Sequence, residues 1–239
     1  MTFTPFVLAI ALAVSPLAGV PTAVAVECDI TDATLTWGFK ESFRSYIDGD
    51  IANGSWTTDG NASYDTPSFT WSGGTGTYTP IYDRTEIAFT GSVRFVGHDG
   101  LLDTTIANPV IRIDGQTGSL ALDVSGPTMD GDPIDLRDVA FVDLAAGDVT
   151  GDDAVRTVDA DTALTADGAI AFPNYESGTA FDPASISMTV GMLCPTAAAV
   201  DDVETSSAPS PLVIGLGVFA ALAVAAIVLV IVLTRRRRA

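Results

Sequence analysis

The sequence predicts a mainly β domain, antiparallel and β-sandwich-like, with a short amphipathic helix near its start and one transmembrane helix behind it. Three observations predict this class. Short β-branched and apolar runs recur along the middle of the 239-residue chain, and glycine, proline, asparagine and aspartate separate them. A segment near the start has a helical period, and a long uninterrupted apolar run stands close to the C-terminus.

The predicted strands are short and are divided by turn-forming residues. Apolar residues alternate with others on either side of Gly91: Ile87, Phe89, Val93 and Phe95. Further β-branched or apolar runs lie at 110–113, 120–124, 139–144 and 186–193. The expected breaks are Asn108-Pro109, Asp114-Gly115, Gly126-Pro127 and Asp130-Gly131. Such short runs with frequent turn signals are typical of an antiparallel all-β domain.

The one helical segment lies near the start of this domain. Its apolar residues recur at intervals of three and four: Phe39, Phe43, Tyr46 and Ile47. That spacing places them on one face of an α-helix. Asp48-Gly49 follows as a stop signal. The segment also carries two cations one turn apart, Lys40 and Arg44, in a domain that has few cations.

The first residues of the chain predict export. The apolar run from Phe6 to Val14 is too short to cross a bilayer, which takes about 20 residues. Small residues follow it, and Ala23-Val24-Ala25 has the A-x-A form that signal peptidase accepts. No Lys or Arg precedes the run, so the usual positive charge is missing. We expect residues 1–25 to be a signal peptide cleaved after Ala25.

The last residues predict a membrane anchor. Residues 212–233 form a continuous apolar run long enough for about 30 Å of hydrocarbon. Residues 234–239 contain four arginines, and positive charge marks the cytoplasmic side of a span. Residues 197–211 are small, acidic and proline-containing, as in a flexible stalk. We therefore expect a single-pass cell-membrane protein, with residues 26–196 outside the cell and the C-terminus inside.

The net charge of the chain disfavours one class of binding partner. The formal net charge is −19, and a polyanion is poorly suited to bind nucleic acid, whose phosphates need Lys and Arg. The acidic stretches 148–153 and 159–161 raise a calcium site as an alternative to solvated loops. They lack the EF-hand spacing, so solvated loops are the favoured interpretation.

The chain has two cysteines, Cys28 and Cys194, one at each end of the expected extracellular domain. Outside the cell an even pair of this kind predicts a disulfide; two unpaired thiols are the alternative. Two cysteines and one histidine are too few for a His/Cys zinc cluster.

Two residues are candidates for chemistry, and each has an ordinary structural interpretation. His98, the one histidine, stands in a glycine-flanked segment and by itself would be a turn residue. Tyr46 lies on the apolar face of the predicted helix, where tyrosine is usually part of the core. There is no G-x-S-x-G motif and no Gly-rich phosphate loop, so the sequence does not predict an enzyme.

Three longer segments resemble the signatures of one family. The opening signature of the HtaA domain, the haem-binding module of actinobacterial haem-uptake proteins, is similar to residues 35–46 (LTWGFKESFRSY). Its central signature resembles residues 89–103 (FTGSVRFVGHDGLLD), and its closing motif resembles residues 175–183 (YESGTAFDP). The likeness covers essentially the whole extracellular domain. One such domain between a signal peptide and a span is similar to the HtaB-like surface proteins of this family.

The resemblance implies a haem site and its residues. An iron-coordinating tyrosine follows the S-F-R motif of the family, and its position here is Tyr46. The family's histidine maps to His98, and a further tyrosine of lesser role maps to Tyr175. A phenolate oxygen suits hard ferric iron, and a neighbouring histidine would support it. The residues expected around the haem, as propionate partners or apolar lining, are Lys40, Arg44, Trp37, Phe39 and Phe43.

The sequence thus predicts a surface protein that binds ferric haem, takes it from host haemoproteins or a sister haem receptor, and passes it to the binding protein of a haem ABC transporter. A structural or adhesive β-domain of the cell envelope, without a ligand, is the alternative. Catalysis is not implied by either interpretation.

Overall fold

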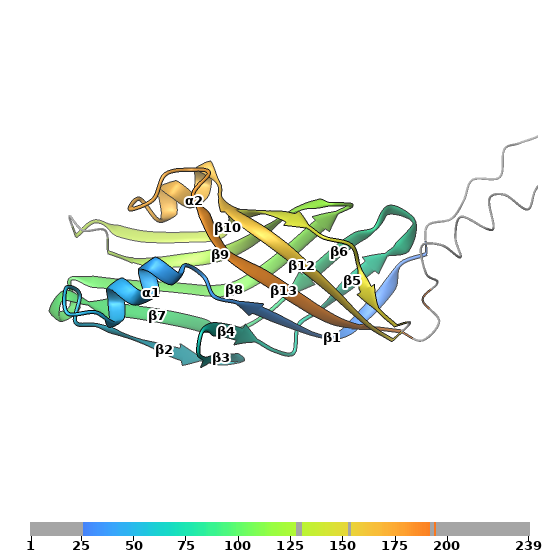
Figure 1. Cartoon of the computed structure of the whole chain (residues 1–239), viewed down its shortest axis with the longest axis horizontal. Coiled ribbons are helices and arrows are strands. Elements are labelled where there is room, and N and C mark those ends of the chain that lie inside the picture. The colour runs from blue at the N-terminus through green and yellow to red at the C-terminus, as the bar shows by residue number, and fades with distance from the viewer. Residues whose placement is uncertain (1–25, 128–130, 153, 192–193, 195–239) are drawn as a thin grey trace, which may run out of the picture.

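A computed structural model describes residues 26–127, 131–152, 154–191 and 194. The signal peptide, stalk, membrane span and arginine-rich tail expected from the sequence lie outside these residues. Within the described part, no helix is long and apolar enough to cross a membrane. The molecule is elongated, with both α-helices near one end and the two ends of the domain at the other (Figure 1).

The structure is built mainly from antiparallel strands, as the sequence predicts. The strands are β1 (Cys28–Trp37), β2 (Ser55–Asp59), β3 (Ala62–Asp65), β4 (Ser68–Trp71), β5 (Thr75–Thr79), β6 (Arg84–Ala88), β7 (Ser92–Gly97), β8 (Leu102–Asp114), β9 (Thr117–Pro127), β10 (Pro133–Ala146), β11 (Thr150–Gly151), β12 (Val155–Leu164) and β13 (Ala180–Val190). The helices are α1 (Glu41–Asp48) and α2 (Ala166–Ala171), with 3-10 turns η1 (Pro80–Tyr82) and η2 (His98–Gly100).

The strands form one hydrogen-bonded sheet that closes on itself. The path β1–β5–β6–β8–β9–β10–β12–β13 returns to β1, because β13 pairs with both β12 and β1. Strands β7 and β2 extend from β8, and β4 and β3 extend from β1. The expected β-sandwich is therefore corrected to a single continuous sheet. Alternation in the sequence reports which face of a strand is buried, but it does not report which strands are partners.

One expected break is not a break. Asn108-Pro109 lies inside β8, where the register with β9 shifts between Ala107 and Val110. Asn108 has a left-handed backbone with φ of 50°. An extra residue of this kind makes a β-bulge, which bends a strand without ending it. Asp114-Gly115, by contrast, forms the expected turn between β8 and β9.

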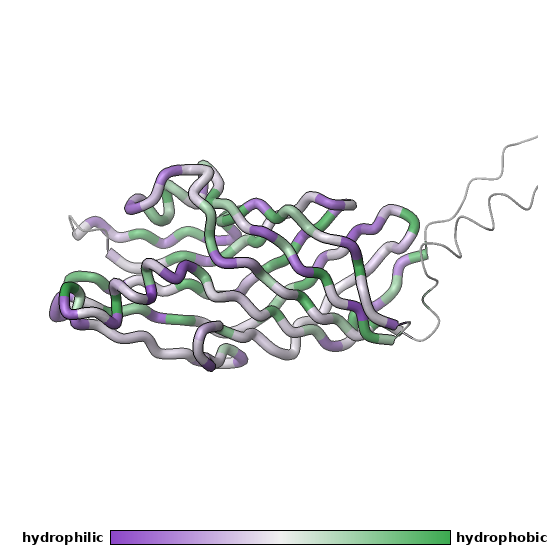
Figure 2. The backbone as a smooth tube through the Cα atoms, viewed as in Figure 1, coloured by the Kyte–Doolittle hydropathy of each residue, from purple (hydrophilic) through white to green (hydrophobic). Residues whose placement is uncertain are grey.

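Aromatic side chains form the core inside the closed sheet, at the end of the molecule where the two helices lie. Phe39 is completely buried, and its ring stacks on those of Phe95 and Phe141 with centroids 5.6 Å apart in both cases. Phe43 and Phe172 pack edge-on against it at 5.8 and 5.5 Å. Along the strands, hydrophobic and hydrophilic positions alternate (Figure 2), as expected for a sheet with one buried face. This core is the support on which α1 rests.

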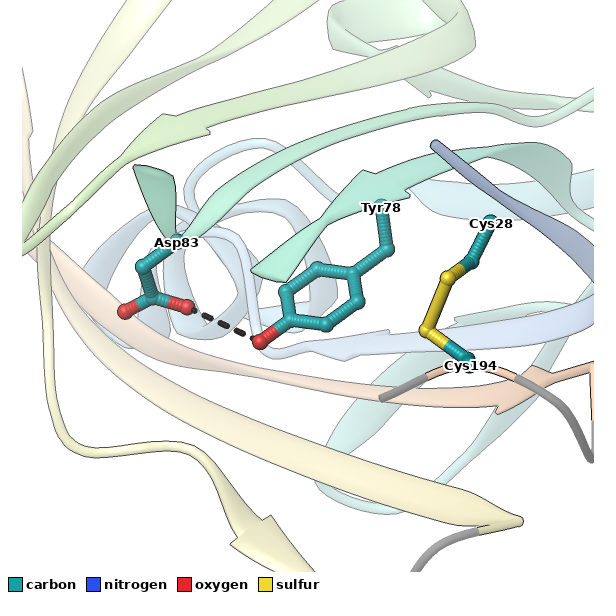
Figure 3. Close-up of a disulfide and its surroundings, with 4 residues drawn as sticks. All are labelled: Cys28, Tyr78, Asp83 and Cys194. Atoms are coloured by element: carbon teal, nitrogen blue, oxygen red, sulfur yellow. Dashed lines mark hydrogen bonds between the residues drawn. A yellow bond between two sulfur atoms is a disulfide. The ribbon is translucent and has the colours of Figure 1, made fainter. Parts of the chain in front are cut away.

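A disulfide joins the two ends of the domain (Figure 3). Cys28 at the start of β1 is bonded to Cys194, 166 positions later, and this confirms the pairing expected from the sequence. Close to it, the Tyr78 hydroxyl donates to Asp83 Oδ1 at 3.4 Å, and the Arg156 guanidinium lies 4.6 Å from the centre of the Tyr78 ring. Burial raises the pKa of the Asp83 carboxyl, and burial followed by the charge of Asp83 raises that of the Tyr78 phenol.

Candidate functional site

Tyr46 and His98 meet at the helical end of the molecule. Tyr46 lies in the last turn of α1, and its hydroxyl is hydrogen-bonded to His98 Nε2 in η2. The ring centroids are 5.7 Å apart. The backbone holds the two segments together, since the His98 N–H donates to the Ala52 carbonyl at 2.7 Å. The two residues singled out from the sequence thus form one pair, and the hydrogen bond between them involves the phenol oxygen of Tyr46.

The backbone of η2 is shaped to present His98. His98 and Asp99 both adopt left-handed conformations, with φ of 51° and 53°. Such a conformation is uncommon for residues other than glycine, and two in succession mark a tightly constrained turn. The Leu101 N–H donates to the His98 carbonyl at 3.1 Å and closes this turn. The imidazole therefore extends from a fixed turn rather than from a free loop.

An open cavity of about 280 Å³ lies beside this pair. Its lining residues are Phe43, Tyr46, Leu102, Asn174 and Tyr175. A smaller hollow of about 40 Å³ shares Phe43, Leu102 and Asn174 with it and continues toward β9 and β10. The cavity thus offers flat aromatic and aliphatic walls, with a phenol oxygen supported by an imidazole.

Tyr175 forms the opposite side of the cavity. It lies in the segment between α2 and β13, and its ring stacks on Phe172 at 5.4 Å with the planes 5° apart. Lys40 Nζ is 5.9 Å from the centre of the Tyr175 ring and donates to the Ala180 carbonyl at 2.7 Å. In the described part of the chain no carboxylate lies within ion-pair distance of Lys40. Lys40 thus lies next to a residue that lines the cavity, and its charge is not used in an ion pair with a described residue.

Arg44 and Trp37, which were expected around the haem, do not line the cavity. The Arg44 side chain is 9% exposed, and its guanidinium pairs with Asp182 Oδ2 at 2.7 Å. Trp37 is completely buried and donates from Nε1 to the Asp182 carbonyl at 2.7 Å. Phe39 is equally buried in the core, so among the expected lining aromatics Phe43 is the one that borders the cavity.

Asp182 was not among the residues predicted from the sequence. It lies in β13, and its Oδ1 accepts the Glu41 N–H at 2.9 Å while its Oδ2 accepts Arg44. The one signal for it was its place in the closing motif, in the segment 175–183. Its partners are about 140 positions away, and composition alone does not indicate such pairs.

The acidic loops present no clustered metal ligands among the described residues, where no group of three or more His, Cys, Asp or Glu side chains converges. Asp152 instead accepts the N–H groups of Ala154 and Val155 at 2.9 and 2.7 Å. These hydrogen bonds lower the pKa of the Asp152 carboxyl. In this loop the carboxylate stabilises a turn.

Comparisons with known proteins identify relatives of the chain. Among solved structures, the C-terminal domain of HtaA from Corynebacterium glutamicum is 36% identical, covers 69% of this chain and 99% of that domain, and superposes with a TM-score of 0.65. The N-terminal domain of the same protein is 32% identical, with 68% and 98% covered and a TM-score of 0.58. The haem-binding protein HtaB of that organism shares the fold at 21% identity, with 70% and 98% covered and a TM-score of 0.56.

No curated protein matches in a direct sequence search. The profile of the HtaA family, described as Htaa, matches residues 32–187, which is more than half of the chain and includes every residue of the cavity. The family resemblance predicted from the three signature segments is thereby confirmed, and the chain belongs to the HtaA domain family.

Proposed function

We propose that this chain binds haem, with the Tyr46 phenol oxygen as the ligand of ferric iron. The observation that carries the proposal is the pairing of Tyr46 with His98 beside a cavity lined by aromatic side chains. Membership of the HtaA family supports it, as does the fold shared with HtaB, which is described as a haem-binding protein.

The residues around the cavity fit this ligand in three respects. Tyr46 offers an oxygen donor, and ferric haem supplies a hard iron centre that favours such a donor. Phe43, Leu102 and Tyr175 offer apolar contact for a flat macrocycle. Lys40, which is next to Tyr175 and makes no ion pair with a described residue, could attract a carboxylate such as a propionate.

His98 controls the proton of the proposed ligand. A tyrosine hydroxyl must lose its proton to become an anionic donor, and the hydrogen bond to Nε2 gives that proton a base to move to. Once protonated, the imidazole donates an N–H to the phenolate oxygen and holds it in place. Partners that orient a metal ligand in this way typically account for about 10- to 100-fold in metal affinity.

We further propose that the domain is displayed outside the cell and carries haem without transforming it. The sequence features in support are the signal peptide predicted at 1–25 and the membrane anchor predicted at 212–233. In this proposal haem comes from host haemoproteins or a sister receptor and passes to the binding protein of an ABC transporter.

Titration with haemin tests the proposed ligand. The purified chain should bind haemin with a high-spin ferric spectrum and a tyrosinate charge-transfer band. Tyr46→Phe keeps the ring and removes only the oxygen, so the band should vanish and most of the affinity should be lost. Tyr82→Phe is the matched control, because Tyr82 is exposed in η1, away from the cavity.

Two results would contradict the proposal. Parent-like binding by Tyr46→Phe, together with loss in His98→Ala, would make histidine the iron ligand. A parent chain that shows no saturable haemin binding would favour the structural or adhesive alternative.

A further inference from the structure

The helix that carries Tyr46, α1, has few stabilising features of its own. It has eight residues, and an isolated helix shorter than about 12 to 15 residues is marginal in water. Its N-cap is Lys40, whose side chain makes no capping hydrogen bond. The first backbone N–H groups of α1 therefore need a partner from elsewhere in the fold.

Asp182 supplies that partner from β13. Its two carboxylate oxygens are divided between two groups of α1: Oδ1 accepts the Glu41 N–H at 2.9 Å, and Oδ2 accepts the Arg44 guanidinium at 2.7 Å. A negative charge at a helix N-terminus is favourable, and hydrogen bonds between charged groups are among the stronger ones. The Asp182 side chain is 23% exposed and that of Arg44 9% exposed, so solvent weakens the pair only partly.

The backbone of Asp182 is fixed as well. Its carbonyl accepts Trp37 Nε1 at 2.7 Å and Thr162 Oγ1 at 3.0 Å, and its N–H donates to the Phe39 carbonyl at 2.9 Å. Strands β1, β12 and β13 therefore all hold this residue. The carboxylate that caps α1 is consequently attached to the rigid sheet rather than to a loop.

We infer that Asp182 is a positioning residue for Tyr46, an inference that rests on the proposed haem-binding function. Arg44 is two residues before Tyr46, and Phe43 and Ile47 bury the same short helix in the core. Because α1 has about two turns, fixing its first turn fixes the direction in which its last turn presents the phenol. Asp182 thus sets where the proposed iron ligand lies, although it does not line the cavity.

Gly38 offers an independent way to disturb the same contact. A Cβ at this position would lie 2.3 Å from Asp182 Oδ2, so an alanine would displace the carboxylate. The backbone of Gly38 is not in the left-handed region, so the substitution acts through this contact and not through backbone strain. Gly38→Ala therefore perturbs the cap while it leaves the carboxylate and Arg44 in the protein.

The test compares Asp182→Asn and Gly38→Ala with the parent chain in two measurements. The first is the haemin-saturated spectrum and the affinity. We expect both variants to lose about half or more of the tyrosinate band and to bind about 10- to 100-fold more weakly, as when a ligand loses an orienting partner. The second is hydrogen exchange of the amides of α1 without haem, which should be faster in both variants.

The control is Asp114→Asn, which removes the exposed ion pair of Asp114 with Arg84 at 2.8 Å. It should leave the spectrum and the exchange of α1 unchanged. Variants that only melt at lower temperature, with the saturated spectrum and the exchange of α1 like those of the parent, would overturn the inference. If the parent itself does not bind haemin, the proposed function fails, and exchange alone decides whether Asp182 fixes α1: faster exchange upholds that role, and parent-like exchange refutes it.

Discussion

The Tyr46 hydroxyl and His98 Nε2 are hydrogen-bonded to each other although the two residues lie 52 positions apart in the chain. One comes from a helix and the other from a constrained turn between two strands. Either side chain alone would be an ordinary core or turn residue. Together at the edge of a cavity they place a phenol oxygen and an imidazole nitrogen within hydrogen-bond reach, and the predictions about the site start from this pair.

Replacing His98 should weaken haem binding without abolishing ligation. His98→Ala removes the partner of the phenol oxygen, and we expect about a 10- to 100-fold loss of affinity, or roughly 1.4 to 2.8 kcal/mol. The tyrosinate band should survive in shifted form, because the iron–oxygen bond remains. Absorption spectra at saturating haemin check this. A complete loss of the band would contradict the prediction, because the phenolate would then need His98 in order to bind iron at all.

Replacing Tyr175 should have the smallest effect of the three site residues. Tyr175→Ala removes one wall of the cavity and its stacking on Phe172, but no atom bonded to iron in the proposed complex. Tyr175→Phe, which keeps the stacked ring, is the matched control and should bind like the parent. Haemin affinities of both variants decide this, and a loss as large as that of Tyr46→Phe would make Tyr175 a ligand.

Removing the disulfide should lower stability but leave the site intact. The bond closes a loop of 166 positions, for which the chain-entropy estimate is about 5 kcal/mol. Helix α1, whose Tyr46 lines the cavity, lies toward the opposite end of the molecule from the start of β1 (Figure 1). Reduction, or paired Cys28→Ser and Cys194→Ser, should therefore lower the melting temperature while haemin affinity at 25 °C stays unchanged. Thermal unfolding and titration measure the two effects separately.

Two aspartates should affect stability with opposite dependence on pH. Burial raises the folded-state pKa of Asp83 above its ordinary 3.8, so its stabilising contribution is present at lower pH and is lost as pH rises through the raised pKa. The hydrogen bond from Arg94 lowers the pKa of Asp103, so that contribution is present above 3.8 and is lost as pH falls.

Replacing each of these two aspartates by asparagine tests the two pH dependences of stability separately. Asp83→Asn imitates the protonated acid, so it should gain stability relative to the parent as pH rises above 3.8. Asp103→Asn should lose stability relative to the parent as pH rises toward 3.8, and that loss should then stay constant at higher pH. Denaturant unfolding from pH 3 to 7 measures both differences, and parallel curves for the two variants would contradict the assignment.

The proposed membrane anchor predicts a protected C-terminus. With residues 212–233 in the bilayer and the arginines of 234–239 inside, protease added to intact cells should release the domain by cutting within 197–211. A tag placed after Ala239 should resist that digestion. Cleavage of the tag from outside would show the reverse orientation.

Much of the fold was predictable because it depends on local patterns. The spacing of Phe39, Phe43, Tyr46 and Ile47 predicted a helix, and α1 contains the last three and ends at Asp48 as its stop signal indicated. Phe39 was wrongly placed in that helix, because it precedes the N-cap and has a left-handed backbone with φ of 63°. The apolar runs 110–113, 120–124 and 139–144 lie in β8, β9 and β10, and the run that begins at 186 lies in β13 up to Val190. The short helix α2 was not predicted, because Ile170 is its one large apolar residue and a period needs several.

The rest depends on contacts between distant segments. Closure of the sheet follows from β13 pairing with both β1 and β12, and no local pattern reports that choice. Asn108-Pro109 has the composition of a turn, yet its neighbours in the sheet make it a bulge. Asp182 was missed for the same reason, since its partners Glu41 and Arg44 lie about 140 positions earlier in the sequence. Arg44 was expected to bind a haem propionate, but in the structure its guanidinium pairs with the carboxylate of Asp182.

The position of the disulfide has a mechanical consequence. Cys194 closes the domain immediately before residues 195–239, and its bond to Cys28 joins the exit of β13 to the start of β1. A pulling force applied through the C-terminal segment would be divided at Cys194 between β13 and, through this covalent bond, β1. Because Asp182 is also on β13, the bridge lowers the tension that this strand carries toward the support of Tyr46. In a chain anchored as proposed through residues 212–233, tension from the membrane would therefore be shared by two strands of the closed sheet.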